Sequence, residues 1–352
     1  MAKYLKPKAK PRFVWLKVLL IILLVILLLV GSVVAFVWHK LDLIQYDDEI
    51  DYGVYQTEAV ETVAEETEDP NMEIVDVSDL EIVETMPTVP EAEVKQEQNV
   101  VNILLIGTDE RTKKFNTDAR SDSMILVSID KDRNTVKLVS LERGMGVPIL
   151  EGQYEGKYDW LTHIFRYGGA DLLTKTVEHC FKVEIDSYVR VNFHSVEQIV
   201  DSVGGIEIEL TKAEAGYLGV MYPVKAGMNY VDGEIALSYA RLREIDSDWT
   251  RVKRQRKVIL AMVDALKGSS LKELNDLANE VLPLVQTDMS KTDIAEMMLY
   301  APNLLTAEFD QMTIPKHGTY GGSKVLGGRS AFAVDFEENT KILHEFLFGT
   351  EE

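Results

Sequence analysis

The sequence contains a single cysteine, Cys180, so it cannot form an intramolecular disulfide. Cys180 lies among the apolar residues Val177, Phe181 and Val183, which is typical of a small buried residue rather than of a reactive thiol. Basic residues are also scarce, because 37 Lys and Arg stand against 58 Asp and Glu, for a formal net charge of −21. Proteins that bind nucleic acid usually carry a basic face and a high isoelectric point, so this balance argues against that class.

One apolar run is long enough to cross a membrane. Residues 18–37 are all apolar or small, which suffices for a hydrocarbon core about 30 Å thick. Residues 1–17 contain six basic residues and no acidic one, so the positive-inside rule predicts a cytoplasmic tail, a transmembrane helix at 18–38 and export of the rest. A cleaved signal peptide is the alternative. It needs a shorter apolar core and small residues at its end, where this chain has Phe36 and Trp38.

The stretch 39–99 has almost no positive charge. Between residues 41 and 98, nineteen acidic residues and the single Lys95 give a net charge of about −18. Such a segment buries too little apolar surface to offset the entropy lost on ordering, and its like charges keep it extended. We therefore expect residues 39–99 to form a disordered acidic linker.

After residue 99 the sequence alternates between strand and helix patterns. Apolar or alternating runs predict strands at residues 101–106, 124–129, 136–141, 188–191, 206–210 and 312–314. Helical spacing, capping residues and glycine stops predict helices at residues 170–181, 195–203, 232–241, 250–266, 271–281, 291–300 and 335–348. This alternation indicates a layered α/β/α domain with a central mixed sheet. Its main body is expected at residues 100–268, with a C-terminal helical extension, 269–352, packed on the same domain.

Two aspartates stand at the ends of the first two predicted strands. Asp109 follows the first strand, and Asp122 directly precedes the second. If the strands are neighbours, both carboxylates converge on one sheet edge. There they could hold Mg²⁺ or Mn²⁺ together with phosphate oxygens and water. Spacing alone favours the alternative, in which both are loop aspartates that cap turns.

Arginines gather at the ends of predicted strands and helices. They are Arg143, Arg241, Arg243, Arg251, Arg254 and Arg256. Guanidinium groups stay charged and bind phosphate oxygens bidentately, so a local positive concentration in an acidic domain suggests an anionic ligand. The alternative is a solvated basic helix face, and we assign Lys253 and Arg256 to such a face.

Several segments, in order and spacing, resemble the LytR-CpsA-Psr family. They are 102–111 (NILLIGTDER), 120–130 (RSDSMILVSID), 167–171 (YGGAD), 188–193 (YVRVNF), 203–210 (VGGIEIEL), 237–243 (LSYARLR) and 248–258 (DWTRVKRQRKV). The resemblance implies an extracytoplasmic phosphotransferase held in the membrane by one helix. It would move a glycan phosphate from a polyprenyl-diphosphate-linked glycopolymer, such as wall teichoic acid or capsule, to peptidoglycan and release polyprenyl phosphate.

The family pattern also implies roles for single residues. Asp109 and Asp122 would hold Mg²⁺, and together with Arg143 and Arg241 they would form the catalytic group. The diphosphate would be bound by Arg120, Arg143, Arg241, Arg243, Arg251, Arg254 and Gln255. Apolar helices would line a tunnel for the lipid tail. A transcriptional regulator is disfavoured, because DNA lies on the other side of the membrane from the exported domain.

The sequence departs from the family pattern at one place. The family usually has proline, arginine and aspartate after the third strand, where this chain has Glu142, Arg143 and Gly144. The arginine is kept and the following carboxylate is absent. By strand alternation, the side chain of Glu142 points to the opposite face of the sheet, so it does not simply replace the missing aspartate. Two further functions therefore stay open, a catalytically impaired scaffold that binds polyprenyl phosphate and a hydrolase of the same diphosphate. His163 is interpreted as structural.

Overall fold

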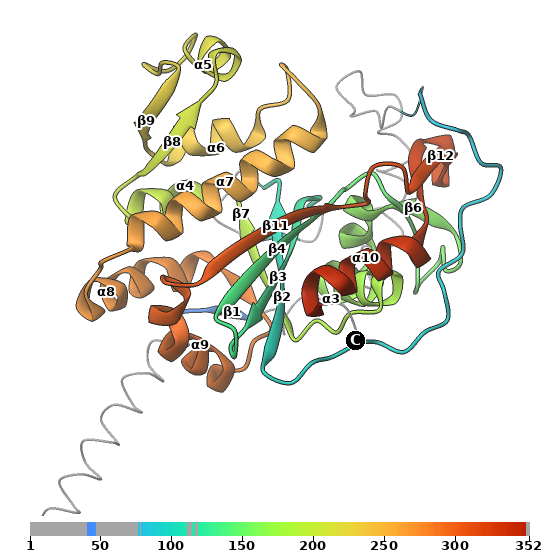
Figure 1. The fold of residues 1–352 in the computed structure, drawn as a ribbon, viewed down its shortest axis with the longest axis horizontal. Coiled ribbons are helices and arrows are strands. Elements are labelled where there is room, and N and C mark those ends of the chain that lie inside the picture. Colours follow the sequence, from blue (N-terminus) through green and yellow to red (C-terminus); the bar gives the residue numbers. More distant parts are fainter. Residues whose placement is uncertain (1–40, 47–76, 78, 111–114, 117–118, 350–352) are drawn as a thin grey trace, which may run out of the picture. The chain divides into compact units, whose positions relative to one another are not determined.

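The computed structural model describes residues 41–46, 77, 79–110, 115–116 and 119–349. Within those ranges no helix is both long and apolar enough to span a membrane, and the transmembrane helix predicted at 18–38 lies outside them. The chain divides into two compact units, Met1–Leu43 and Ile44–Glu352. The second unit contains the strands and helices labelled in Figure 1.

A mixed sheet of seven described strands forms the centre of the second unit (Figure 1). Its strands are β1 (Gln45–Tyr46), β2 (Val100–Thr108), β3 (Ser121–Asp130), β4 (Thr135–Leu141), β7 (Ser187–Asn192), β10 (Gln286–Thr287) and β11 (Glu308–Ile314), in the order β1-β10-β7-β2-β3-β4-β11. The pairs β2–β3 and β3–β4 are antiparallel, whereas β7 joins β2 and β11 joins β4 in parallel. The predicted central mixed sheet is confirmed.

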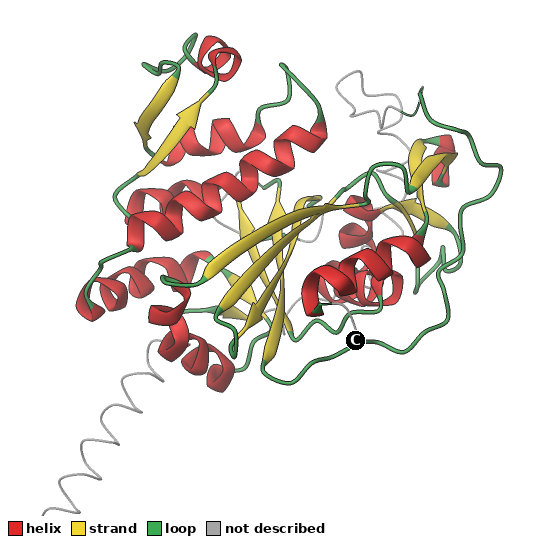
Figure 2. Ribbon diagram, viewed as in Figure 1, coloured by secondary structure: helices red, strands yellow, loops and turns green. Residues whose placement is uncertain are grey.

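Helices cover both faces of this sheet (Figure 2). On one face lie α3 (Leu161–Phe181) and α10 (Phe336–Phe348), and on the other lie α4 (Phe193–Ser202), α6 (Gly233–Arg241) and α7 (Asp248–Leu266). Alternation along the strands separates the two faces. In β2, Leu104 and Ile106 are fully buried in the core with α3, while Leu105 between them faces the other helices. The predicted α/β/α layering follows from this alternation.

The predicted boundaries of the main helices hold to within a few residues, except that α3 begins nine residues earlier than the predicted 170–181. Gly168 and Gly169 have non-helical backbone angles, so the expected break is a kink inside α3. Asp232 and Asp335 cap α6 and α10, since each side chain accepts a hydrogen bond from the backbone amide three residues later in the chain. Helices α8 (Leu271–Val281) and α9 (Lys291–Leu304) complete the predicted set.

Several short elements were not predicted. They are β5 (Gly146–Pro148), β6 (Tyr158–Trp160), α5 (Lys212–Leu218), β9 (Gly227–Val231), β12 (Tyr320–Lys324) and β13 (Ser330–Val334). Strand β9 pairs with β8 (Ile206–Leu210), and this hairpin and α5 pack with α4, α6 and α7 around a second core. These elements are three to seven residues long, too short for a clear periodic signal.

Two predicted segments have more structure than expected. Residues 79–99 run along the domain as extended chain rather than as a disordered linker. Ile82 bridges to Gly322, and the Lys95 amide donates to the Lys182 carbonyl at 2.8 Å. The segment is ordered because its backbone groups find partners on the domain.

Residues 269–352 are not only a helical extension, because β11 adds a strand to the central sheet beside β4.

Candidate active site

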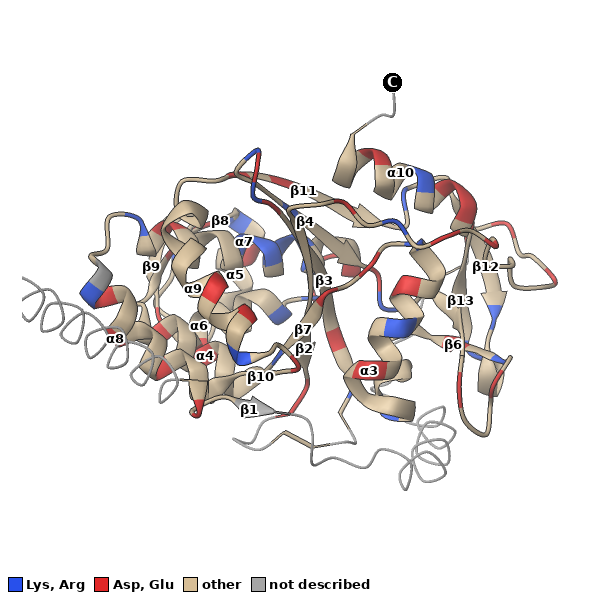
Figure 3. Cartoon of the chain, turned by 90° about the horizontal axis from the view of Figure 1, so that it is seen from below, with Lys and Arg blue, Asp and Glu red and all other residues tan. Residues whose placement is uncertain are grey.

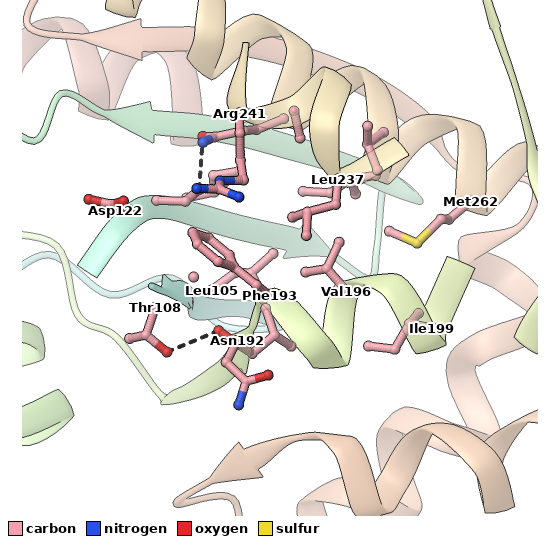
Figure 4. A pocket seen from close by; sticks show the side chains of 18 of the residues that line it. Leu105, Thr108, Asp122, Asn192, Phe193, Val196, Ile199, Leu237, Arg241 and Met262 are labelled. Atoms are coloured by element: carbon pink, nitrogen blue, oxygen red, sulfur yellow. Dashed lines mark hydrogen bonds between the residues drawn. The ribbon is translucent and has the colours of Figure 1, made fainter. Parts of the chain in front are cut away.

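A pocket lies between the sheet and helices α4, α6 and α7, and it encloses roughly 300 Å³. Most of its wall is apolar, from Leu105 and Ile125 on the sheet and from Val196, Ile199, Leu237 and Met262 on the helices. Figure 4 shows Asp122 and Arg241 at one end and Ile199 and Met262 at the other. The pocket is therefore a slot with one polar end, a shape that suits a long apolar ligand with an anionic head.

Asp122 lies at the polar end of this pocket, and Asp109 lies near it at the same sheet edge. Strands β2 and β3 are antiparallel neighbours with Thr108 opposite Ser121, so the end of one strand meets the start of the other, as expected. Asp109 accepts hydrogen bonds from the amide of Arg120 at 3.0 Å and from its Nε at 3.1 Å. Asp122 lines the pocket and pairs with Nη1 of Arg143 at 3.0 Å.

Aspartates and arginines alternate from Asp122 toward helix α7. Arg143 contacts Asp122 on one side and, through Nε at 3.4 Å, Asp248 on the other. Asp248 in turn pairs with Nε of Arg251 at 2.8 Å. Arg251 also donates to the backbone carbonyl of Asp122 at 3.3 Å, which closes the ring of contacts. This network holds side chains from β3, from the segment after β4 and from α7 in one arrangement.

Burial raises the pKa of Asp122 above its ordinary value, and the neighbouring Asp109 carboxylate adds to the rise while Arg251 opposes it. The two aspartates therefore interact electrostatically across the sheet edge. In the parts of the chain that the structure describes, no group of three or more His, Cys, Asp or Glu side chains gathers where a metal could bind. A cation at this edge would have two carboxylates as its protein ligands.

Cationic side chains from the end of α6 and the start of α7 surround the polar end. The pocket is lined there by the arginines Arg241, Arg243 and Arg251 and by the neutral Gln255. The guanidinium of Arg241 lies 4.2 Å from the centre of the Phe193 ring, and no carboxylate among the described residues pairs with it. Burial lowers the pKa of Arg243, and the positive charge of Arg251 lowers it further. This end of the pocket is thus set up for an anionic group.

Comparison with known proteins identifies the family. The LytR_cpsA_psr family model matches residues 54–345. This chain belongs to the LytR-CpsA-Psr family. The polyisoprenyl-teichoic acid–peptidoglycan teichoic acid transferase TagT of Bacillus subtilis is 32% identical over 221 residues, which cover 60% of this chain and 67% of TagT. The corresponding transferase TagU of Enterococcus faecalis is 33% identical over 250 residues, or 69% and 78% of the two chains.

A solved structure agrees with the fold. The structure of TagT bound to LIIa-WTA matches with a TM-score of 0.57 and 25% sequence identity, and the match covers 72% of this chain and 94% of that chain. The mixed α/β architecture with a central mixed sheet is therefore the architecture of LytR-CpsA-Psr proteins.

Not every residue expected at the diphosphate lies in the pocket. Arg254 points elsewhere: it is 3% exposed, pairs with Glu214 at 2.7 Å and with Asp246, and donates to the Leu242 carbonyl at 2.8 Å. These partners fix the loop after α6, so the predicted phosphate contact is corrected to a structural role. Arg120 and Arg143 lie beside the pocket and bind its aspartates rather than forming its wall.

Glu142 lies at the place where this chain departs from the family pattern. It is 2% exposed, and its carboxyl group lies next to the Asp248 carboxylate. Burial raises the pKa of Glu142 well above its ordinary value, and the charge of Asp248 raises it further. The raised pKa favours the protonated form of Glu142 beside Asp248. Strand β4 ends at Leu141, so Glu142 is the first residue after that strand. The prediction that Glu142 does not simply replace the missing aspartate stays a prediction.

Two site residues were missed in the sequence. Asp248 joins Arg143 to Arg251, and its position three residues before Arg251 on the first turn of a helix was an available signal. Phe193, the first residue of α4, supports Arg241, and an aromatic ring after a strand gave no comparable signal.

Two residues judged structural are buried away from the pocket. His163 is 1% exposed and contacts Asp159 at 3.2 Å, and burial lowers its pKa. Cys180 is fully buried, and burial raises the pKa of its thiol. A protonated, inaccessible thiol is not a nucleophile.

Proposed function

We propose that this protein transfers a glycan phosphate from a polyprenyl-diphosphate-linked glycopolymer to peptidoglycan and releases polyprenyl phosphate. The observation that carries the proposal is the apolar slot with Arg241, Arg243 and Arg251 at one end. A lipid tail fits the slot, and its diphosphate then meets the arginines. Relatives named as polyisoprenyl-teichoic acid–peptidoglycan teichoic acid transferases, TagT and TagU, support the same substrate class.

The arginines stabilise the charge that moves during the transfer. The acceptor hydroxyl oxygen attacks the phosphorus on the glycan side of the diphosphate, and the bond to the bridging oxygen breaks. The electron pair leaves with polyprenyl phosphate, and the hydroxyl proton is released. Negative charge therefore grows on the leaving phosphate, which Arg241, Arg243 and Arg251 can neutralise. Arg143 holds Asp122 and Asp248 in place beside them.

Asp109 and Asp122 are the residues that would hold Mg²⁺ or Mn²⁺. Two carboxylates at one edge fit an ion that takes one or two carboxylates and completes its shell with phosphate oxygens and water. When bound, such an ion neutralises charge on the transferring phosphate. Arg120 then orients Asp109, since it contacts that carboxylate through two groups.

The proposed reaction takes place at the outer face of the membrane, where a lipid-linked donor and the wall are both accessible. The apolar run at 18–37 and the basic tail before it support this placement. A tether of this kind would keep the slot in the same leaflet as its lipid substrate.

The test is transfer from a synthetic polyprenyl-diphosphate-linked oligosaccharide to peptidoglycan fragments by the purified full-length protein in detergent. We expect Mg²⁺-dependent transfer that Asp109→Asn and Arg241→Ala each reduce by at least about 100-fold, the size usual for a lost electrostatic contact to the transition state. Arg133→Ala, on the surface with 63% of its side chain exposed, is the matched control and should keep full activity.

The products separate the proposal from its alternatives. Free glycan phosphate without attachment would show a hydrolase. Tight binding of polyprenyl phosphate without turnover would show a scaffold, the outcome that Gly144 in place of the usual aspartate favours. Full transfer by both site variants would overturn the site assignment.

A further inference from the structure

Helix α7 presents two different faces. Arg251, Gln255 and Met262 line the apolar slot. Trp249, Lys253 and Arg256 lie on the opposite side of the helix at 100° per residue, and they line a second cleft against β11 and residues 315–320. The assignment of Arg256 to a solvated face is wrong, because only 4% of this residue is exposed. Lys253 is exposed, as expected.

Arg256 is a buried cation whose contacts are all neutral. Its guanidinium donates to Gln311 Oε1 at 3.0 Å, to Thr313 Oγ1 at 3.1 Å and to the Ser140 hydroxyl. No carboxylate within the described ranges pairs with it, and burial alone lowers its pKa to about 10 from 12.5. By contrast, carboxylates pair with the buried arginines Arg190, Arg251, Arg254 and Arg329.

A buried charge without an opposite charge beside it is costly in a folded protein, and hydrogen bonds to neutral oxygens offset only part of that cost. The chain has 58 acidic residues from which a partner could have come. The absence of a carboxylate beside Arg256 leaves its positive charge available to an anion that enters from outside.

The cleft around Arg256 has the composition of an anion site. It encloses about 410 Å³, and its lining includes Lys253, Lys316 and His317 but no carboxylate. Figure 3 shows the basic residues gathered on α7. Trp249 and Tyr320 stack with ring centres 5.6 Å apart and form an aromatic wall. Cations beside aromatic rings suit a ligand in which phosphates alternate with sugar or polyol units.

The cleft adjoins the candidate active site at two points. Trp249 directly follows Asp248 of the aspartate–arginine network. Burial raises the pKa of Tyr320, and the nearby Glu142 carboxyl group raises it further. A polymer attached to a diphosphate at the slot would therefore have a basic surface next to it. In a protein with a net charge of −21, a polyanion needs such a surface to stay close to the chain.

We infer that the cleft between α7 and β11 binds phosphodiester groups of the anionic polymer being transferred. Arg256 and Lys253 contact successive phosphates, Lys316 adds a third cation, and the wall of Trp249 and Tyr320 packs against the units between them. This inference rests on the proposed function for the identity of the polymer, but not for the binding itself.

The test is calorimetric binding of a glycerol-phosphate oligomer without a lipid tail to the full-length protein. We expect binding that weakens with salt, that Lys253→Ala and Lys316→Ala each reduce about two- to fivefold, and that Arg256→Gln reduces about tenfold. Arg256→Gln keeps hydrogen-bonding capacity at the buried position. The two lysine variants keep the test valid if that variant does not fold. Lys267→Ala, at the exposed end of α7, is the matched control.

Three results would overturn the inference: binding unchanged in all three cleft variants, equal binding of a neutral oligosaccharide, or inorganic phosphate competing as well as the oligomer does. Loss of binding in Arg241→Ala would also overturn it, since the oligomer would then occupy the slot. If the wild-type protein binds the oligomer through the cleft yet transfers no polymer, the proposed function fails and the cleft assignment stands.

Discussion

Blocking the apolar slot with a large side chain should make this protein select lipids by their length. Val196 and Ile199 lie one helical turn apart on α4, and both line the slot. Figure 4 places Ile199 at the end away from Asp122 and Arg241, with Val196 nearer to them. Val196→Trp should therefore remove more of the space for the tail than Ile199→Trp, while the arginines stay in place.

The size of the effect follows from the apolar surface that the tail can no longer bury. An isoprene unit has five carbons, and burying each contributes about 0.8 kcal/mol, so one excluded unit costs up to about 4 kcal/mol. Since 1.4 kcal/mol is tenfold in affinity, the loss per excluded unit is up to about a thousandfold. Ile199→Trp should lose the outermost bound unit, and Val196→Trp should lose that unit and part of the next.

The assay is equilibrium binding of polyprenyl diphosphates of increasing chain length. For the wild type, affinity should rise with each unit until the slot is full. For the variants it should level off at shorter lengths, with unchanged affinity for a diphosphate that carries a single isoprene unit. Gln198→Trp places the same ring on α4 away from the slot and should behave as the wild type. Equal length dependence in the slot variants and the wild type would refute the assignment of the slot to the lipid tail.

Two further predictions concern buried charges. Because the pKa of Glu142 is raised, the folded state keeps a proton that the unfolded chain loses above pH 4.5, so wild-type stability should fall as pH rises from there through the raised pKa. Glu142→Gln should flatten that decline in thermal unfolding measured against pH, and an unaltered decline would contradict the raised pKa. Arg254→Ala should cost about 3–5 kcal/mol of unfolding free energy, because Glu214 and Asp246 lose their partner. Its affinity for polyprenyl diphosphate should change less than threefold, and a large loss of affinity without a loss of stability would return Arg254 to the diphosphate site.

Much of the fold was readable from local patterns. The apolar runs of β2 and β3 and the aspartate caps of α6 and α10 depend on residues within a few positions of one another. The candidate site could be read in part for the same reason. Asp109 and Asp122 lie at the meeting ends of two paired strands, whose geometry brings them together. Arg241 and Arg243 lie at the C-terminal end of α6 and Arg251 lies in the first turn of α7, and all three line the pocket.

The sequence by itself determined most of the longer strands and helices and where charged residues stand on them, because those properties depend on near neighbours. The tertiary structure decided which partner each charged side chain meets. Arg251 and Arg254 share one helix, yet one lines the slot and the other holds Glu214, 40 residues away in sequence. Arg256, next to Gln255, lies buried over Ser140 and Thr313 in two paired strands. Those contacts join residues far apart in the chain, so no local pattern contains them, and the burial that sets their chemistry exists only once the strands and helices pack.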